Sequence, residues 1–233
     1  MSRRIALLDW DGTLRKDFTI RAWIKFLVKN GALPEKAVED IEAVFGLLFR
    51  GSISHDEASR RTAAIYAFYL RGHSKAEITK MASLFFEEDT QYLCSFSSAL
   101  LSCLSCNSIQ TVVISGAPVE ILQEHQRVFP IEHIHALELQ TVEGVFMDKV
   151  LTNSGTAQEK HLIVDHLLKS QMYDIVLAAG NSSSDLPLLD SAPASIIVNN
   201  PDLKTKAKCL YLFCDDADIG RMLNFLEEVT YGP

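Results

Sequence analysis

The chain has 233 residues, of which 48% are hydrophobic, and its 22 basic and 30 acidic residues give a net charge of −8. This length fits one large domain or a domain with an insertion, and this apolar content excludes a globally disordered chain. An acidic chain without a basic cluster is a poor nucleic-acid binder. No apolar run approaches the roughly 18 residues of a membrane helix, and the N-terminal apolar run is too short for a signal peptide. We expect a cytoplasmic protein with neither a nucleic-acid nor a membrane partner, and the sequence leaves its oligomeric state unknown.

The chain has five cysteines, an odd number, and a core this large does not need a disulfide framework. Cys103 and Cys106 form a C-x-x-C spacing, but no second pair lies at the distance typical of zinc fingers. We therefore predict that the cysteines are ordinary buried thiols.

The first predicted strand covers residues 3–9, which are apolar and end in an aspartate before a glycine turn. From about residue 18 to residue 100 the apolar spacing is helical, with no strand signal. Gly31, Gly51 and Gly72 separate the helices, and Ser-x-x-Glu patterns begin two of them. The sequence thus predicts an all-helical block after the first strand.

Strands return after this block. The alternation of strands and helices predicts an α/β fold with a doubly wound, mostly parallel, Rossmann-like sheet, interrupted by the inserted helical block. Two of the strands are predicted to form a hairpin through Gln140–Gly144. The predicted strands cover residues 108–116, 133–139, 144–151, 173–181 and 194–200, and the predicted helices cover 118–129, 154–170, 183–192 and 216–229.

Polar residues follow several of these strands. Asp9 and Asp11 follow the first strand, Ser115 and Gly116 end the second, and Asn181 follows the strand at 173–181. Sites in such sheets form at the carboxyl ends of the strands, so these residues are expected to share one edge. Asp185 and Lys160 join them from neighbouring segments: Asp185 comes just after Asn181, and Lys160 lies on the preceding helix.

These residues resemble the motifs of the haloacid dehalogenase superfamily. Its first motif, D-x-D-G-T, is similar to residues 9–13, and its second, a hydroxyl residue after an apolar strand, is similar to Ser115. Its third is a lysine, here Lys160, and its fourth is similar to the stretch from Gly180 to Asp185. The helical block lies where one branch of the superfamily, which includes phosphoserine-phosphatase-like enzymes, carries its cap. The resemblance therefore implies a catalytic core at 1–17 and 100–233 and a helical cap at 18–99.

The resemblance also implies roles for the residues. Asp9 would be the nucleophile that forms an aspartyl phosphate, and Asp11 the general acid and then the base. Mg²⁺ would be the cofactor, held by Asp9, Asp185, the Asn181 amide oxygen and the Asp11 backbone carbonyl. The residues expected to hold the phosphoryl oxygens are Thr13, Ser115, Gly116 and Lys160.

The chain departs from the motifs of this branch at two places. Asn181 stands where the fourth motif usually has aspartate, and an amide oxygen can still bind a hard cation. Phe18 stands where the phosphoserine enzymes place a glutamate that holds the substrate's amine, whereas Arg60 corresponds to their carboxylate-binding arginine. We therefore expect a small phosphorylated metabolite as substrate, contacted by Phe18 and Arg60 and different from phosphoserine.

The resulting hypothesis is a magnesium-dependent phosphomonoester hydrolase. Two alternatives stay open. The first is a phosphotransferase that passes the phosphoryl group to an acceptor other than water. The second is a non-catalytic scaffold that binds a metabolite or partner, an alternative that rests on Asn181 alone.

Overall fold

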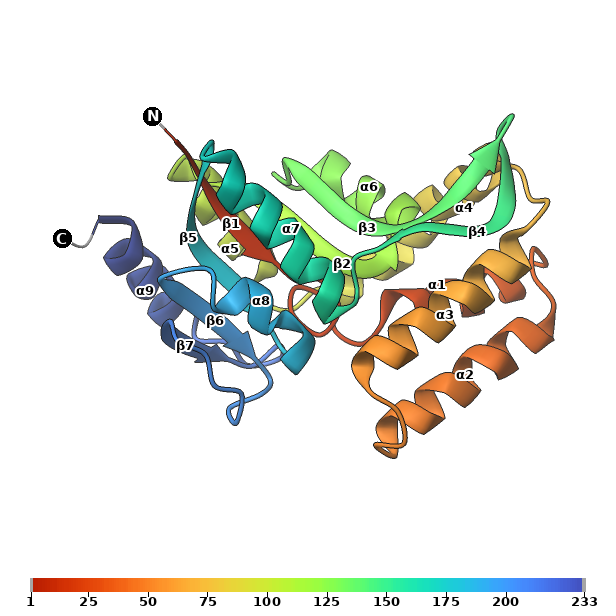
Figure 1. Cartoon of the computed structure of the whole chain (residues 1–233), viewed down its shortest axis with the longest axis horizontal. Coiled ribbons are helices and arrows are strands. Elements are labelled where there is room, and N and C mark those ends of the chain that lie inside the picture. The colour runs from red at the N-terminus through yellow and green to blue at the C-terminus, as the bar shows by residue number, and fades with distance from the viewer. Residues whose placement is uncertain (1, 232–233) are drawn as a thin grey trace.

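The computed structural model of the protein describes residues 2–231 and forms an α/β fold around one central sheet (Figure 1). The described strands follow the order β4-β3-β2-β1-β5-β6-β7. All neighbours run parallel except the antiparallel pair of β3 and β4. The strands are β1 (Arg3–Leu8), β2 (Gln110–Pro118), β3 (His133–Val142), β4 (Val145–Asn153), β5 (Tyr173–Gly180), β6 (Ala194–Val198) and β7 (Lys208–Leu212).

Helices cover both faces of this sheet, and further helices form a block beside it (Figure 1). None of the described helices is long and apolar enough to cross a membrane. The helices are α1 (Thr19–Lys29), α2 (Glu35–Phe49), α3 (His55–Leu70), α4 (Lys75–Asp89), α5 (Ser97–Cys106), α6 (Val119–Val128), α7 (Ala157–Ser170), α8 (Leu186–Leu189) and α9 (Ile219–Tyr231), with short 3₁₀ turns η1 (Thr90–Tyr92) and η2 (Ser183–Asp185).

The central strand β1 shows why the sheet is doubly wound. Successive side chains of a strand point to opposite faces. Ile5 and Leu7 pack in the apolar cluster that contains α7 and α8, whereas Ala6 and Leu8 pack in the cluster that contains α5 and α9. All four residues are fully buried, which explains why residues 5–8 form an unbroken apolar run in the sequence. The predicted fold class, a mostly parallel doubly wound sheet with an inserted helical block, is confirmed.

The predicted hairpin is present as β3 and β4. Its turn residues Glu143 and Gly144 both have positive φ, 51° and 77°, as a type I′ hairpin turn requires. Two elements are absent from the sequence prediction, the helix α5 and the strand β7. The strand has only five residues, and α5 is rich in serine and cysteine, which are weak helix formers.

Helices α1 to α4 pack around a buried apolar cluster of their own. In it the Trp23 indole N–H donates to the Tyr66 hydroxyl over 3.0 Å, which joins α1 to α3. Ile121 of α6 and Leu137 and Phe146 of the β3–β4 hairpin belong to the same cluster. The helical block is therefore fixed against the hairpin by shared apolar packing.

The two segments that lead into and out of the helical block lie side by side. The Lys16 N–H donates to the Tyr92 carbonyl, and the Cys94 N–H donates to the Leu14 carbonyl. Between them Arg15 donates two N–H groups to one oxygen of Asp89, over 2.9 and 2.6 Å, and both side chains are buried. This buried ion pair, made by two hydrogen bonds, fixes the two segments relative to each other.

Cys94 and Cys214 form a disulfide, and of the free cysteines Cys106 is exposed while Cys103 and Cys209 are partly buried, so the expectation of ordinary buried thiols is wrong. The fold brings the segment before α5 against the segment after β7, where the Ser95 N–H donates to the Cys214 carbonyl. The two cysteines are 120 residues apart, and sequence spacing cannot reveal a contact of this range.

Candidate active site

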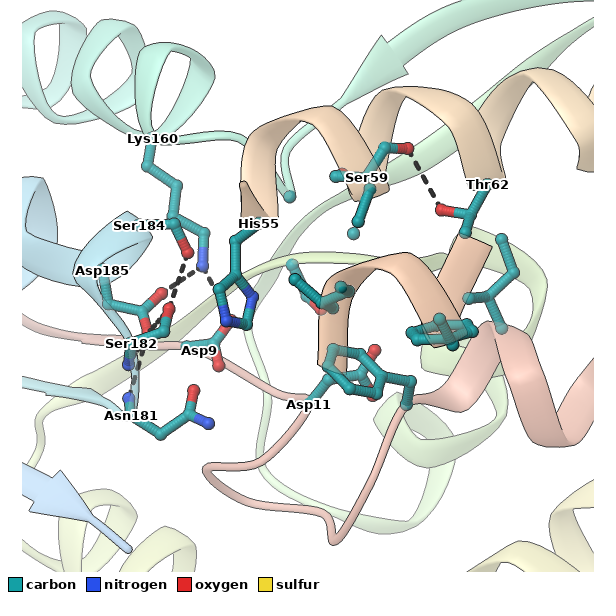
Figure 2. A pocket seen from close by; sticks show the side chains of 18 residues that line it. Asp9, Asp11, His55, Ser59, Thr62, Lys160, Asn181, Ser182, Ser184 and Asp185 are labelled. Carbon is teal, nitrogen blue, oxygen red and sulfur yellow. Dashed lines mark hydrogen bonds and ion pairs between the residues drawn. The ribbon is translucent and has the colours of Figure 1, made fainter. Parts of the chain in front are cut away.

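The residues predicted to share one sheet edge converge there (Figure 2). Asp9 and Asp11 follow β1, Ser115 lies near the end of β2, and Asn181 follows β5. These strands are neighbours in the sheet, with β1 between β2 and β5. Asp185 comes from η2, and Lys160 from the first turn of α7. All six side chains line one pocket.

A buried ionic cluster forms the floor of this pocket. The Lys160 ammonium donates to Asp9 Oδ1 over 2.7 Å and to Asp185 Oδ1 over 2.5 Å. All three side chains are almost fully buried. Asp185 also accepts the backbone N–H groups of Asn181 and Ser182, which fix its second oxygen. One cation thus holds two carboxylates that would otherwise repel each other.

The pKa values follow from this arrangement. Burial, with the charge of Asp185, raises the pKa of Asp9 to about 7, although Lys160 and Thr13 lower it. Burial also raises the pKa of Asp185, but the Lys160 charge and the hydrogen bonds outweigh it, so that this pKa lies below its ordinary value. Burial lowers the pKa of Lys160, but the two aspartates raise it by more than burial lowers it. The pKa therefore lies above its ordinary value, and the ammonium stays charged.

Thr13 is fully buried and contacts Asp9, but it is outside the set of pocket-lining residues. Its hydroxyl donates to Asp9 Oδ2 over 2.8 Å and lies 3.4 Å from the Asn181 amide oxygen. In this structure Thr13 therefore orients Asp9, which differs from the phosphate contact expected from the sequence.

Asp11 lies beside Asp9 but has a different environment. Its Oδ1 accepts the backbone N–H of Thr19 over 2.9 Å and the Thr19 hydroxyl over 2.5 Å, at the start of α1. Burial raises the pKa of Asp11 to about 6, while Arg15 and Thr19 lower it. A carboxyl with a pKa in this range can both give and accept a proton near neutral pH.

Glycines allow two close approaches at the site. Gly12 has a φ of +78°, and a Cβ there would lie 2.2 Å from the Asn181 amide nitrogen. Gly116 abuts Gly155, and a Cβ on Gly155 would lie 2.5 Å from the Ser59 hydroxyl oxygen. The Ser115 hydroxyl accepts the Ala117 N–H beside them. The missing side chains therefore leave room for Asn181 beside Gly12 and for Ser59 beside Gly155.

The helical block supplies the opposite side of the pocket. Phe18, predicted as a substrate contact, lines it; Arg60 does not, and its half-exposed side chain lies 3.8 Å from Glu57. The pocket residues of α3 follow the spacing i, i+3, i+4, i+7, which is one face of a helix, and Arg60 lies outside that face. These residues are His55, Ala58, Ser59 and Thr62.

Sequence reasoning missed these α3 residues, together with Phe45 and Leu48 of α2 and Ser182 and Ser184. The helical periodicity of α3 was the available signal, but it does not say which face meets the sheet edge. In the structure, hydrogen bonds between two residues 94 positions apart fix which face of α3 meets the sheet edge. The Ser59 hydroxyl donates to Asn153 Oδ1, and Asn153 Nδ2 donates to the Ser59 carbonyl.

The oxygen atoms of the pocket fit a hard divalent cation. Carboxylates and carbonyl oxygens are the ligands of Mg²⁺, and Asp9, Asp185 and the Asn181 amide supply them here. The Thr13 hydroxyl, in contact with both Asp9 and Asn181, brings two of these groups together. The described residues contain no cluster of three or more His, Cys, Asp or Glu side chains placed for a metal, so the amide and backbone oxygens would complete such a site.

The known structures most relevant to this arrangement share its fold at low sequence identity. A Bordetella pertussis Tohama I protein of unknown function aligns with a TM-score of 0.72 and 18% identity, covering 87% of this chain and 92% of that one. A phospho-aspartyl intermediate analogue of phosphoserine phosphatase aligns with a TM-score of 0.66 and 16% identity, covering 97% and 99%. Phosphoserine phosphatase from T. onnurineus aligns with a TM-score of 0.58 and 16% identity, covering 97% and 95%.

The sequence comparisons identify the family. No curated protein matches the chain significantly. The model of the haloacid dehalogenase-like hydrolases matches residues 6–190, a range that begins in β1 and includes Asp9, Lys160 and Asp185. With this match over most of its length, and with the motif residues gathered in one pocket, the chain belongs to the haloacid dehalogenase-like hydrolase family.

Proposed function

We propose that the protein is a magnesium-dependent phosphatase that hydrolyses a small phosphomonoester through an aspartyl phosphate on Asp9. The observation that carries this proposal is the buried cluster of Asp9, Lys160 and Asp185, with Asp11 beside it. The family match and the phosphoserine phosphatase neighbours support the same reaction class. Residues 1–17 and 100–233 would form the catalytic core, and 18–99 the cap.

In the first step a carboxylate oxygen of Asp9 attacks phosphorus, and the bond from phosphorus to the leaving alcohol oxygen breaks. Asp11, whose pKa of about 6 lets it carry a proton near neutral pH, gives that proton to the alcohol. Lys160, the Ser115 hydroxyl and the backbone at Gly116 stabilise the phosphoryl oxygens as charge develops on them.

In the second step water attacks the aspartyl phosphate, and Asp11 takes the proton from this water. Inorganic phosphate leaves, and the carboxylate of Asp9 is restored. Mg²⁺, held by Asp9, Asp185, Asn181 and the Asp11 carbonyl, would supply positive charge that reduces the repulsion between Asp9 and the phosphate.

The test is phosphate release from a panel of small phosphomonoesters, with Mg²⁺ and with a chelator. We expect wild-type protein to release phosphate only with Mg²⁺, and Asp9→Asn to release none. Asp174→Asn, at an exposed position on β5, is the matched control and should retain activity. Chelator-resistant release, or full activity in Asp9→Asn protein that is folded by circular dichroism, would contradict the proposal.

A further inference from the structure

The pocket has two unlike sides. The side from the sheet edge contains Asp9, Asp11, Lys160 and Asp185, whereas the side from the helical block, which we name the cap wall, contains no Asp, Glu, Lys or Arg among the described pocket residues. The cap wall consists of Phe18, Ile20, Phe45, Leu48, His55, Ala58, Ser59 and Thr62. The phosphate binds at the sheet edge in the proposed function, so the cap wall faces the leaving group.

Aromatic packing keeps the apolar part of the cap wall in place. The rings of Phe18 and Phe45 lie 4.7 Å apart at their centroids, and Phe45 is only 2% exposed. Leu48 lies one turn from Phe45 on α2 and is partly buried. A preformed apolar surface of this kind binds an apolar group at small entropic cost.

The nearest cation on α1 is not available to a ligand. Arg21 lies against the Phe45 ring, with its guanidinium carbon 5.7 Å from the centroid, but it is outside the set of pocket-lining residues. Two of its nitrogens donate to the two carboxylate oxygens of Glu42, each over 2.8 Å. This two-point pairing neutralises the charge of Arg21 next to the cap wall.

The charged residues at the start of α3 also have partners within the protein. Asp56 accepts the backbone N–H of Ala157, at the first residue of the helix that carries Lys160. Glu57 accepts the Arg61 Nε over 2.7 Å and lies 3.8 Å from Arg60. None of these side chains lines the pocket.

The two hydroxyl groups of the cap wall already have partners within the protein. The Thr62 hydroxyl donates to the Ser59 carbonyl, and the Ser59 hydroxyl donates to Asn153. The His55 ring points into the pocket (Figure 2), 6.4 Å from the Phe18 ring at the centroids, and no described residue forms a hydrogen bond with it. A polar atom of a substrate can therefore bind at His55, whereas a fixed charge finds no Asp, Glu, Lys or Arg side chain on the cap wall to pair with.

We propose, building on the phosphatase function above, that the leaving alcohol of the substrate is uncharged and largely apolar, and that Phe18, Phe45 and Leu48 select it. An ammonium or carboxylate on the leaving group would lose water at the cap wall without gaining a partner. The cap wall therefore selects against phosphorylated amino acids and sugar acids and favours phosphate esters of aromatic or aliphatic alcohols.

The test compares benzyl phosphate with 4-carboxybenzyl and 4-(aminomethyl)benzyl phosphate and with O-phosphoserine. The ring substituents lie far from the reacting oxygen, so the three benzyl esters differ chiefly in the charge that meets the cap wall. We expect kcat/KM for benzyl phosphate to exceed that of each charged ester by at least about 30-fold. Equal or higher kcat/KM for the charged esters would overturn the inference and leave the phosphatase function intact.

Substitutions of cap-wall residues test whether the cap wall causes this selectivity. Phe18→Ala is expected to lower kcat/KM for benzyl phosphate about tenfold and to leave that for ethyl phosphate nearly unchanged, because only the larger group reaches the ring. Leu48→Ala, on another helix, should act in the same direction. Phe68→Ala, a phenylalanine of α3 that is 61% exposed and outside the pocket, is the matched control. An equal loss for both esters in the Phe18 and Leu48 variants would overturn the assignment.

A binding measurement separates this inference from the proposed reaction. Calorimetry would follow wild-type protein with benzylphosphonate and with 4-carboxybenzylphosphonate, which cannot be hydrolysed at the P–C bond. Tighter binding of benzylphosphonate than of its 4-carboxy analogue would uphold the selectivity. If none of the esters were hydrolysed as well, the phosphatase function alone would be rejected. Equal binding of both, or binding of neither, would overturn the selectivity.

Discussion

The two sides of the pocket differ in every property that matters for chemistry. At the sheet edge, the buried Lys160 ammonium donates to two buried carboxyl groups, those of Asp9 and Asp185, and a third carboxyl, Asp11, lies beside them. The cap wall, built from a helical block inserted after β1, contributes aromatic, aliphatic, hydroxyl and imidazole side chains and no Asp, Glu, Lys or Arg among the described pocket residues. In the function that we propose, the sheet edge carries out the reaction and the cap wall selects the leaving group. The sheet edge can therefore be tested without the cap wall.

The largest effect is expected at Lys160. In Lys160→Met the two buried carboxylates of Asp9 and Asp185 lose their shared cation, which costs stability, about 3–5 kcal/mol for a broken buried pair. The loss of a cation at the phosphoryl site should lower kcat about 1,000-fold. Thermal unfolding and phosphate release measure the two effects.

Lys169→Met is the matched control, because Lys169 lies on the same helix but is 79% exposed and pairs only with Asp165. It should change neither quantity. Full activity of Lys160→Met at a temperature where the protein is folded would contradict the role of the ionic cluster.

Asp11→Asn tests the proton transfer at the same edge. An amide cannot protonate the leaving alcohol, so kcat/KM for an alkyl phosphate should fall about 100-fold. The loss should be much smaller for 4-nitrophenyl phosphate, whose leaving group departs without a proton. A uniform loss for both esters would show that Asp11 acts by positioning instead, through its hydrogen bonds to Thr19.

The sheet edge could be predicted from sequence, whereas the cap wall could not. Asp9 and Asn181 directly follow strands and Ser115 lies near the end of one, and the carboxyl ends of parallel strands meet in space. Phe18 was predicted from its distance to the first motif. Arg60 was a wrong choice because it is one residue from Ser59, and neighbours on a helix point in directions about 100° apart. Only the docking of α3 onto distant residues, such as Asn153, selects its pocket face.

Substitutions at the contact between the helical block and α7 are expected to have a smaller effect on activity. Asp56 of α3 accepts the Ala157 N–H at the start of α7, the helix of Lys160. Asp56→Ala leaves this N–H without its acceptor and loosens the docking of the helical block, so kcat/KM should fall about tenfold. Asp56→Asn retains an acceptor oxygen and should lose less. Identical losses in the two variants would show that the charge of Asp56, not its hydrogen bond, is what matters.

The smallest effect on activity is expected at Glu120, a buried residue of α6 near Tyr66 of α3. Burial raises the pKa of Glu120 to about 6 from 4.5. The folded state thus favours the protonated form, and stability falls as the pH rises through this range. Glu120→Gln removes this dependence and should be about 2 kcal/mol more stable than wild type at pH 8, with a smaller difference at pH 5.

Urea unfolding at both pH values measures this difference, and kcat should stay close to that of wild type. Glu77→Gln, at an exposed position on α4, is the control and should show no pH-dependent difference. A Glu120→Gln protein that is less stable than wild type at pH 8 would show that this carboxyl is held ionised by its surroundings.

The most direct test of the account is to find the residue that carries the phosphoryl group. Wild-type protein would be mixed with Mg²⁺ and the best ester of the panel, quenched in acid within milliseconds, reduced with borohydride and digested for mass spectrometry. The account predicts that aspartyl phosphate is trapped on Asp9, and that Asp9→Asn protein treated in the same way yields none. A phosphoryl group on another residue, such as His55, or turnover without any covalent intermediate would contradict it.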